Sequence, residues 1–317
     1  MKAQTMAQKI YSQSPFRGQI HCPAPVTPFS AGGDLMLDAY AEILHYYLEV
    51  VEVDAMMIAG DNGEGYALND NELRQVTETA VATVGARVPI YVHITRTSNR
   101  RCIERAEIAA AAGAPGISLG QPYIHDASAE KIVERFAEVA KAVPLRMMVY
   151  NLPLICHFNI TPPVLRAICD VAEVDLVKDA PMDMGHITTM LAEMGDRFPI
   201  LYGQRLTLVP ALLLDAGGFV GTGPELYGRH CRDFFKVHEM SPSERLDLHA
   251  RYNVLNDALI NTLGTPPAGI KAALKILGLP AGVPRDHVVP LTTAEEERLR
   301  DVMIQAGVLE GSIAKPA

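Results

Sequence analysis

The stretch EVDLVKDAP, residues 173–181, carries an apolar run that ends in a lysine. Val174 to Val177 is mostly apolar and β-branched, which is typical of a buried strand in a parallel sheet. Lys178 follows it, and a lysine is rarely buried without a partner or a chemical purpose. Burial disfavours the charged form, and a neutral amine is a nucleophile that forms Schiff bases with carbonyl compounds. Two interpretations stay open: a catalytic amine, or a lysine that pairs with Asp179 or another acid at the edge of the sheet.

Other short apolar runs alternate with longer helical patterns on both sides of this strand. Strands alternating with helices predict βαβ units and a parallel sheet, and eight of them match a closed (β/α)8 barrel of the TIM type. An open doubly wound sheet would normally carry a glycine-rich turn after its first strand, but Thr27-Pro28-Phe29 stands there. The predicted strands are 21–26, 55–59, 90–94, 116–119, 146–150, 174–177, 200–202 and 218–220. The predicted helices are 38–51, 71–84, 103–112, 129–142, 162–171, 187–194 and 206–216.

Three segments follow from this pattern. Residues 1–17 are polar, without the apolar region of a signal peptide, and predict an N-terminal arm. Residues 18–240 form the predicted barrel. Residues 241–317 form a predicted C-terminal helical domain, because Ser241-Pro242-Ser243-Glu244 is typical of a helix start. Its predicted helices are 245–263, 267–277 and 293–307.

The composition narrows the classes of function. The 317 residues are 49% hydrophobic and 21% charged, with 28 Lys and Arg against 37 Asp and Glu and a net charge of -9. This balance argues against a nucleic-acid partner and against docking to an acidic membrane. The five cysteines contain no CxxC, which predicts a reduced, cytoplasmic protein without a zinc ribbon or a disulfide framework. Every apolar stretch is too short to span a membrane.

The active site of a barrel lies at the carboxyl ends of its strands. Tyr150 and Lys178 end neighbouring predicted strands, so their side chains are expected to meet. A tyrosine beside a Schiff-base lysine can shuttle protons, although a buried tyrosine can also bind only a backbone carbonyl.

Two glycine turns stand at other strand ends. The turn Gly60 to Gly63 offers backbone N–H groups to a carboxylate. Glu64 is then expected in the first turn of a following helix. The run Gly221-Thr222-Gly223 is either a phosphate site or a place of close packing.

A Gly-x-x-Gly-Glu turn, a Tyr-Asn-x-Pro motif and a Val-Lys-Asp motif occur in this order, with 28 residues between Tyr150 and Lys178. Together with the opening Pro25-Val26-Thr27-Pro28-Phe29, they resemble the dihydrodipicolinate synthase/N-acetylneuraminate lyase family. The resemblance implies a barrel with a C-terminal helical domain, a class I aldolase mechanism free of metal and cofactor, and a homodimer or homotetramer. It implies that Lys178 forms an imine with pyruvate or another 2-oxo acid and that Tyr150 relays protons.

The same resemblance implies the substrate-binding residues. Asp61 and Asn62 match the residues that cradle the substrate carboxylate, and Gly203 and Val220 match positions that line the pocket. The family usually has Thr-Thr or Ser-Thr at the first pair. An ionised Asp61 would repel a carboxylate in a dry site. Asp61 therefore points away, is protonated, or meets a hydroxyl or a cation of the substrate.

Two further departures concern the second substrate. Synthases of this family have an arginine shortly after Tyr-Asn-x-Pro, and this chain has Ile155-Cys156-His157 there. They also have a second tyrosine where this chain has Ile124. We therefore hypothesise an enzyme that is not a dihydrodipicolinate synthase and that takes a different second substrate beside Ile155 and Phe158. His157 is either an acid/base for that substrate or the cap of a turn.

Two other classes of protein remain. A metal-dependent barrel hydrolase would use His21, His93, His125 and His157, but no HxH or HExxH spacing is present. A binding or regulatory protein that kept the fold and lost the chemistry would account for Asp61 and Ile124.

Overall fold

The structure is a computed structural model that describes residues 10–124, 127–263 and 265–310. Its internal contacts divide the chain into two compact units. The strand unit comprises Met1–Pro23, Val53–Ile58 and Ala86–Gly221. The helical unit comprises Ala24–Glu52, Ala59–Gly85 and Thr222–Ala317.

The strand unit contains one eight-stranded sheet in the order β1-β8-β7-β6-β5-β4-β3-β2. All seven neighbouring pairs are parallel. β1 also bonds toward β2, since Asp54 N donates to His21 O at 2.9 Å and Met57 N donates to Pro23 O at 3.0 Å. The curled sheet is that of a (β/α)8 barrel, so the predicted fold is confirmed. The strands are β1 (Ile20–His21), β2 (Met56–Ile58), β3 (Ile90–His93), β4 (Gly116–Gly120), β5 (Arg146–Asn151), β6 (Val174–Asp179), β7 (Ile200–Tyr202) and β8 (Gly218–Phe219).

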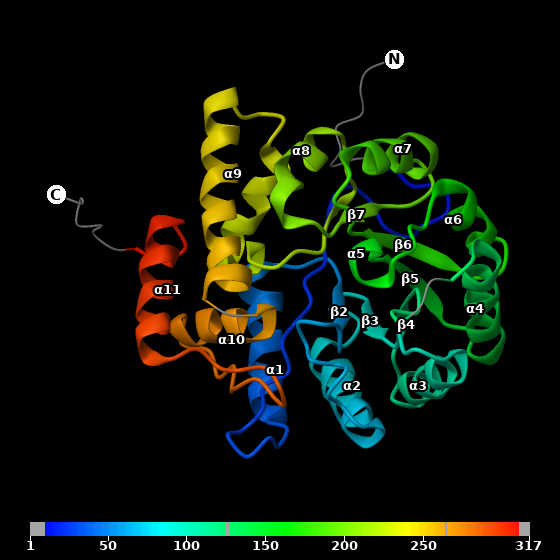
Figure 1. Ribbon diagram of the computed structural model, residues 1–317, viewed down its shortest axis with the longest axis horizontal. Helices are drawn as coiled ribbons and strands as arrows, with labels where there is room; N and C mark the ends of the chain where they lie inside the picture. The colour runs from blue at the N-terminus through cyan, green and yellow to red at the C-terminus, as the bar shows by residue number, and fades with distance from the viewer. Residues whose placement is uncertain (1–9, 125–126, 264, 311–317) are drawn as a thin grey trace. The chain divides into compact units, whose positions relative to one another are not determined.

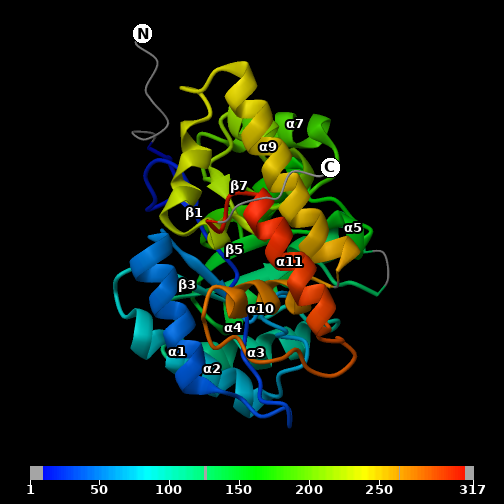
Figure 2. The same ribbon diagram turned by 90° about the vertical axis from the view of Figure 1, so that its left-hand side faces the viewer.

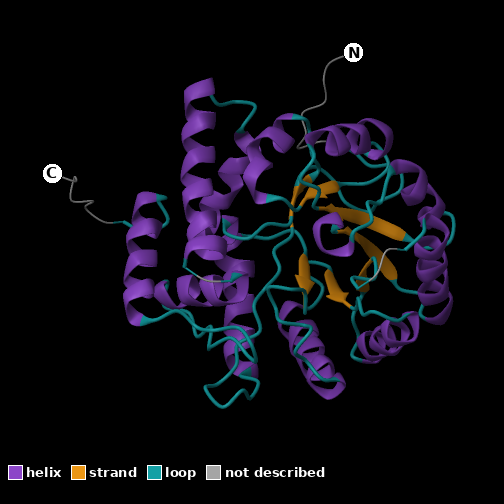
Figure 3. Cartoon of the chain, in the orientation of Figure 1, coloured by secondary structure: helices purple, strands orange, loops and turns teal. Residues whose placement is uncertain are grey.

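The helices α3, α4, α6 and α7 lie around the outside of the strands, whereas the short helix α5 is seen in front of them (Figures 1 and 3). Ser98, Ser128 and Asp183 begin three of them, and each side chain accepts a hydrogen bond from a backbone N–H of the first turn. Such caps satisfy N–H groups that have no partner within the helix. The helices of this unit are α3 (Asn99–Ala111), α4 (Ala129–Ala142), α5 (Pro153–Cys156), α6 (Pro162–Cys169), α7 (Met184–Met194), η3 (Arg205–Thr207) and α8 (Leu208–Leu213).

The helical unit includes the C-terminal helices, where α9, α10 and α11 lie side by side (Figure 2). Asn69, Ser241 and Thr292 each open a helix with a capping box, in which the cap and a glutamate three residues later bond reciprocally. The chain between 10 and 310, apart from 125–126 and 264, contains no helix that is long and apolar enough to cross a membrane. The helices are α1 (Leu37–Tyr46), η2 (Tyr47–Val51), α2 (Asp70–Val84), η4 (Pro224–Lys236), α9 (Pro242–Asp257), η5 (Ala258–Thr262), α10 (Pro266–Ile276) and α11 (Thr293–Gln305).

Several predicted boundaries were wrong for identifiable reasons. β1 ends at His21, because the prolines at 23 and 25 cannot donate a ladder hydrogen bond. β6 continues through Lys178 and Asp179, which pair with Leu201 and Tyr202 of β7. The helices α5 and η4 were not predicted, because each begins with a proline that is also typical of loops.

Candidate active site

Lys178 and Tyr150 are direct cross-strand partners at the carboxyl ends of β6 and β5. Residues at the same register of a parallel pair project to the same side of the sheet. The Lys178 Nζ lies 4.0 Å from the centroid of the Tyr150 ring. The two residues are only 8% and 6% exposed. The structure therefore brings the predicted amine and the predicted phenol together in a buried environment.

His93 and Ser118 extend this group of side chains across β3 and β4, where they are cross-strand partners. The His93 ring meets the Tyr150 ring edge-on, with centroids 5.6 Å apart. Its Nδ1 lies 3.4 Å from Ser118 Oγ. From the sequence, His93 was expected only as one of several scattered possible metal ligands, and no role was expected for Ser118. Their place at the ends of adjacent predicted strands was the signal that could have found them.

Gly203 is needed beside the lysine. A Cβ at this position would lie 3.0 Å from Ala180 Cβ and 3.5 Å from Lys178 Cε. The Gly203 N–H donates to Asp179 O at 2.7 Å. A larger side chain would therefore press on the aliphatic stem of Lys178. Val220 is buried at the end of β8, where its N–H donates to Tyr202 O at 3.1 Å.

Ile155 and His157 are exposed residues at and just after α5. His157 has a φ of 54°, in the left-handed region, and ends the helix. Its N–H donates to Pro153 O at 3.0 Å. This is the geometry of a residue that terminates a turn, which is one of the two interpretations that the sequence left open.

The turn Gly60 to Gly63 belongs to the helical unit. A Cβ at Gly63 would lie 2.8 Å from Pro25 O, so only glycine fits there. Thr27 Oγ1 donates to Gly63 O at 2.7 Å, which ties the opening segment to the turn. Asp61 is exposed, and Asn62 Nδ2 donates to Thr222 Oγ1 at 3.0 Å.

Glu64 does not lie in the first turn of a helix, and that prediction was wrong. α2 begins at Asp70. Glu64 is fully buried, forms an ion pair with Lys271 of α10, and accepts a hydrogen bond from Arg285 N at 2.7 Å. The cause is a partner 207 residues away, which a local pattern cannot indicate.

Gly223 is explained by close packing within the helical unit. Its φ of +107° is in the region that favours glycine, and a Cβ would lie 3.1 Å from Asn256 Nδ2. Its N–H donates to Glu225 Oε2 at 2.9 Å. That N–H group is therefore already used by a carboxylate of the protein itself.

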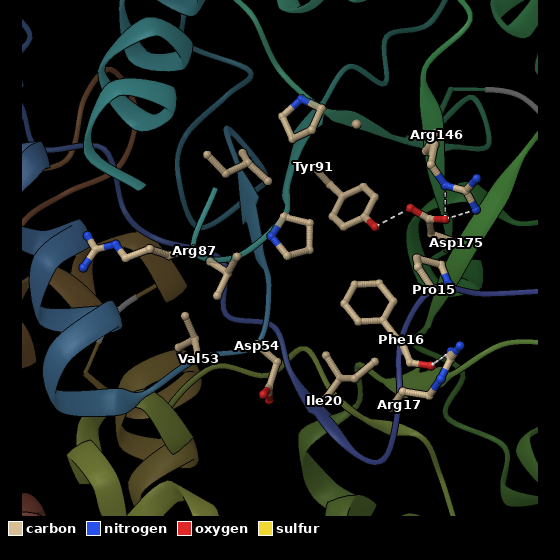
Figure 4. A pocket seen from close by; sticks show the side chains of 15 residues that line it. Pro15, Phe16, Arg17, Ile20, Val53, Asp54, Arg87, Tyr91, Arg146 and Asp175 are labelled. Atoms are coloured by element: carbon tan, nitrogen blue, oxygen red, sulfur yellow. Dashed lines mark hydrogen bonds and ion pairs between the residues drawn. The ribbon is translucent and has the colours of Figure 1, made fainter. Parts of the chain in front are cut away.

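A cavity of about 710 Å³ lies at the opposite, amino-terminal ends of the strands (Figure 4). The labelled residues include Tyr91, Arg146 and Asp175. Tyr91 Oη donates to Asp175 Oδ2 at 2.7 Å, and Arg146 pairs with Asp175 as well. These lining groups satisfy one another, and Asp175 stands near the start of β6 whereas Lys178 stands near its end. The lysine end of the barrel therefore stays the predicted place of the chemistry.

Within the described residues, no three His, Cys, Asp or Glu side chains form a group that could hold a metal ion. His125, one of the histidines considered for such a site, lies outside the described residues.

Comparisons with known proteins agree with this geometry. A family model described as the dihydrodipicolinate synthetase family matches residues 16–306. The 4-hydroxy-tetrahydrodipicolinate synthase of Nitratidesulfovibrio vulgaris is 28% identical over 291 residues, which cover 90% of this chain and 97% of that protein. A dihydrodipicolinate synthase structure from Cyanidioschyzon merolae with lysine bound has a TM-score of 0.82 at 26% identity, and covers 92% of this chain and 99% of its own.

A structure of CdNal from Clostridium difficile in complex with mannosamine has the same TM-score of 0.82 at 19% identity. The match covers 90% of this chain and 97% of the CdNal chain, and it shows that the two share a fold. The match over almost the whole sequence decides the relationship. The chain belongs to the dihydrodipicolinate synthetase family and is a lyase of the class I aldolase type.

Proposed function

We propose that Lys178 forms a Schiff base with the ketone of pyruvate or another small 2-oxo acid. The observation that carries this proposal is the buried Nζ 4.0 Å from the Tyr150 ring. The amine attacks the carbonyl carbon, and the carbinolamine then loses its hydroxyl as water to leave the imine. That loss needs a proton on the departing oxygen, which Tyr150 supplies and later recovers.

The protonated imine withdraws electrons from the neighbouring carbon. That carbon then becomes an enamine nucleophile after losing a proton, or its bond to the next carbon breaks. Aldol condensation, aldol cleavage and dehydration all follow from this intermediate. The proposed activity is therefore a carbon–carbon or carbon–oxygen lyase that needs no metal and no cofactor.

The remaining site residues keep their proposed roles from the family resemblance. The turn of Gly60, Asp61, Asn62 and Gly63 holds the substrate carboxylate through backbone N–H groups. Asp61 is exposed to solvent, and we propose that its side chain faces water rather than the bound anion. Gly203 and Val220 line the pocket.

We further propose that the second substrate is not aspartate semialdehyde. No arginine stands shortly after the Tyr-Asn-x-Pro motif, where this chain has Ile155-Cys156-His157, and Ile124 stands where a second tyrosine is expected. Ile155 and His157 are exposed in that segment and are the proposed contacts of the second substrate. Efficient ring formation from pyruvate and aspartate semialdehyde would overturn this part of the proposal.

Reductive trapping tests the central claim. The enzyme is incubated with a panel of 2-oxo acids and sodium borohydride, and the adduct is located by peptide mass spectrometry. We expect an adduct on Lys178 in the wild type, none in Lys178→Met, and an undiminished adduct in Lys275→Met, which removes an exposed amine of α10. No adduct with any 2-oxo acid would favour the binding or regulatory protein instead.

A homodimer or homotetramer is proposed from the family resemblance, and its mass in solution is measured by light scattering. A cytoplasmic location is proposed from the cysteines, because Cys22, Cys102, Cys156, Cys169 and Cys231 are all free thiols.

A further inference from the structure

Four polar side chains behind the Tyr150–Lys178 pair form a ring of polar contacts, of which three are hydrogen bonds and the fourth is a contact in ion-pair range. Asn151 Nδ2 lies 2.7 Å from Asp179 Oδ1 and 2.8 Å from Asn159 Oδ1. Asn159 Nδ2 lies 2.9 Å from His186 Nδ1. His186 Nε2 faces Asp179 Oδ2 at 3.3 Å. These two atoms are in ion-pair range but do not meet the geometry of a hydrogen bond, and neither has a hydrogen-bond partner within the described part of the chain.

The direction of every hydrogen bond in this ring follows from a single backbone group. The Ile160 N–H can only donate, and it lies 3.0 Å from Asn151 Oδ1. Asn151 must therefore present its oxygen to Ile160 and its NH2 to Asp179 and Asn159. Asn159 then accepts with its oxygen and donates its NH2 to His186 Nδ1.

That donation leaves His186 with its proton on Nε2, the nitrogen that lies 3.3 Å from Asp179 Oδ2. The ring thus requires one tautomer of a neutral imidazole, and this requirement comes from the donor pattern rather than from observed hydrogens. Asn151 and Asp179 are fully buried and His186 is nearly so. A wrong donor pairing there would be costly, because water cannot replace the missing partner.

The ring is built on the catalytic strands themselves. Asn151 and Asp179 are cross-strand partners, one residue after the partners Tyr150 and Lys178. Successive residues of a strand project to opposite faces, so the ring lies on the other side of the sheet from the amine. His186 is in the first turn of α7. Gln121 adds a further brace, since its Nε2 lies 2.7 Å from Asn151 Oδ1.

We propose that Asn151, Asp179, His186 and Asn159 are positioning residues, whose three hydrogen bonds and His186–Asp179 contact fix the ends of β5 and β6 so that Tyr150 stays against Lys178. The role rests on the proposed function, in which these two side chains carry out imine formation. The ring touches neither the substrate nor the reacting atoms. It acts by holding the phenol and the amine at the separation that proton transfer during imine formation requires, where a displacement of about 1 Å can cost on the order of 100-fold in rate.

A pair of variants separates this role from a simple effect of the Asp179 charge. In Asp179→Asn, the new NH2 group faces His186 Nε2. His186 Nε2 can accept from this NH2 group only if the imidazole proton moves to Nδ1. The Nδ1–H group then faces the NH2 group of Asn159, which is also a donor. In either tautomer of His186, one donor faces another donor, so one contact of the ring is lost.

Adding Asn159→Asp again pairs each donor with an acceptor. The direction of donation at both imidazole nitrogens is then the reverse of that in the wild type. Asp at 159 accepts from Asn151 and from His186 Nδ1–H, and His186 Nε2 accepts from Asn at 179. The ring then closes again with the same net charge but with the carboxylate moved away from Lys178.

The experiment measures the rate of borohydride-trapped adduct with pyruvate in the wild type, Asp179→Asn and the double variant. We expect a loss of about 10-fold to 100-fold in Asp179→Asn and recovery to within about threefold of wild type in the double variant. NMR of 15N-labelled histidine, with His186 assigned by His186→Gln, should show the Nε2–H tautomer in the wild type and Nδ1–H in the double variant. The tautomer of His186 reports the direction of the hydrogen bonds in the ring even where a variant loses stability.

Three outcomes decide against the proposal. Wild-type trapping with an unchanged rate in Asp179→Asn would refute the positioning role alone. A double variant that stays as slow as the single one would show that the charge, and not the ring, matters. A wild-type His186 protonated on Nδ1 would refute the ring itself. If the wild type traps a different 2-oxo acid of the panel and not pyruvate, the same comparison is made with that acid. Absence of trapping in the wild type with every 2-oxo acid of the panel would instead overturn the proposed function.

Discussion

The substitution Lys271→Met tests how the helical unit holds the turn that contains Glu64. The two side chains form a buried ion pair, with 1% of the Lys271 side chain and 0% of the Glu64 side chain exposed. The ammonium also donates to Val283 O at 2.8 Å and lies 4.6 Å from the centroid of the Phe29 ring. Methionine keeps the aliphatic stem and removes only the charge and the donors.

The expected cost follows from the group that is left behind. Glu64 would remain buried as a carboxylate without its cation, and breaking a buried pair in this way costs about 3–5 kcal/mol. The Arg285 N–H still donates to the other Glu64 oxygen at 2.7 Å, so we expect the lower end, about 3 kcal/mol. That is a large fraction of a typical free energy of unfolding of about 5–15 kcal/mol.

Equilibrium unfolding in urea measures this change, with Lys275→Met as the matched control on the same helix. Lys275 pairs with Glu296 at the surface, where the side chains are 62% and 27% exposed, so its loss should cost about 0–1 kcal/mol. The double variant Lys271→Met/Glu64→Gln should be more stable than Lys271→Met alone, because no buried charge is then left unpaired. Equal destabilisation by Lys271→Met and Lys275→Met would refute the reasoning.

Two further predictions concern the proton relay and the pH dependence of stability. Tyr150→Phe keeps the ring beside Lys178 but removes the hydroxyl, so we expect imine trapping to slow by about 100-fold or more with an unchanged urea midpoint; a wild-type rate would exclude the relay. Burial raises the pKa of Glu225 from 4.5 to about 7, which means that the native state binds its proton more tightly than the unfolded state. The free energy of unfolding should therefore fall as pH rises from about 4.5 to about 7, by on the order of 3 kcal/mol. Urea titrations of Glu225→Gln should show a smaller fall over the same range, and an unchanged slope would contradict the assignment.

The barrel and its principal pair could be predicted because their signals are local and periodic. β6 is a run of buried residues that ends in Lys178, and β5 ends in Tyr150 at the same register. Parallel strands place their carboxyl ends at one face, so neighbouring strand ends meet whatever the loops do. The spacing of the motifs then pointed to the family that the whole-chain match shows.

Other features depend on partners that no local pattern contains. Glu64 was expected to begin a helix, yet its partner Lys271 lies 207 residues away. His186 was only one residue outside a predicted helix, and its proposed role depends on Asn159, which lies between α5 and α6. The ring contact of His93 with Tyr150 likewise joins two strands that are distant in the sequence. Such groups are found by geometry, because their chemistry comes from neighbours and not from their own sequence context.

The residues that depart from the family pattern are unevenly distributed over the site, and their places bear on which half of the reaction differs. Lys178 and Tyr150, which carry the proposed imine step, match the family and are packed against each other. Apart from Asp61 and Asn62 in the turn proposed for the carboxylate of the 2-oxo acid, the substitutions fall at Ile124 and around Ile155, which the resemblance links to the second substrate. Both are exposed and apolar, so neither could bind the carboxylate of aspartate semialdehyde as a cation would. Under the proposed function, the enzyme therefore shares the first half of the family's reaction, capture of a 2-oxo acid, and differs in what the enamine meets next.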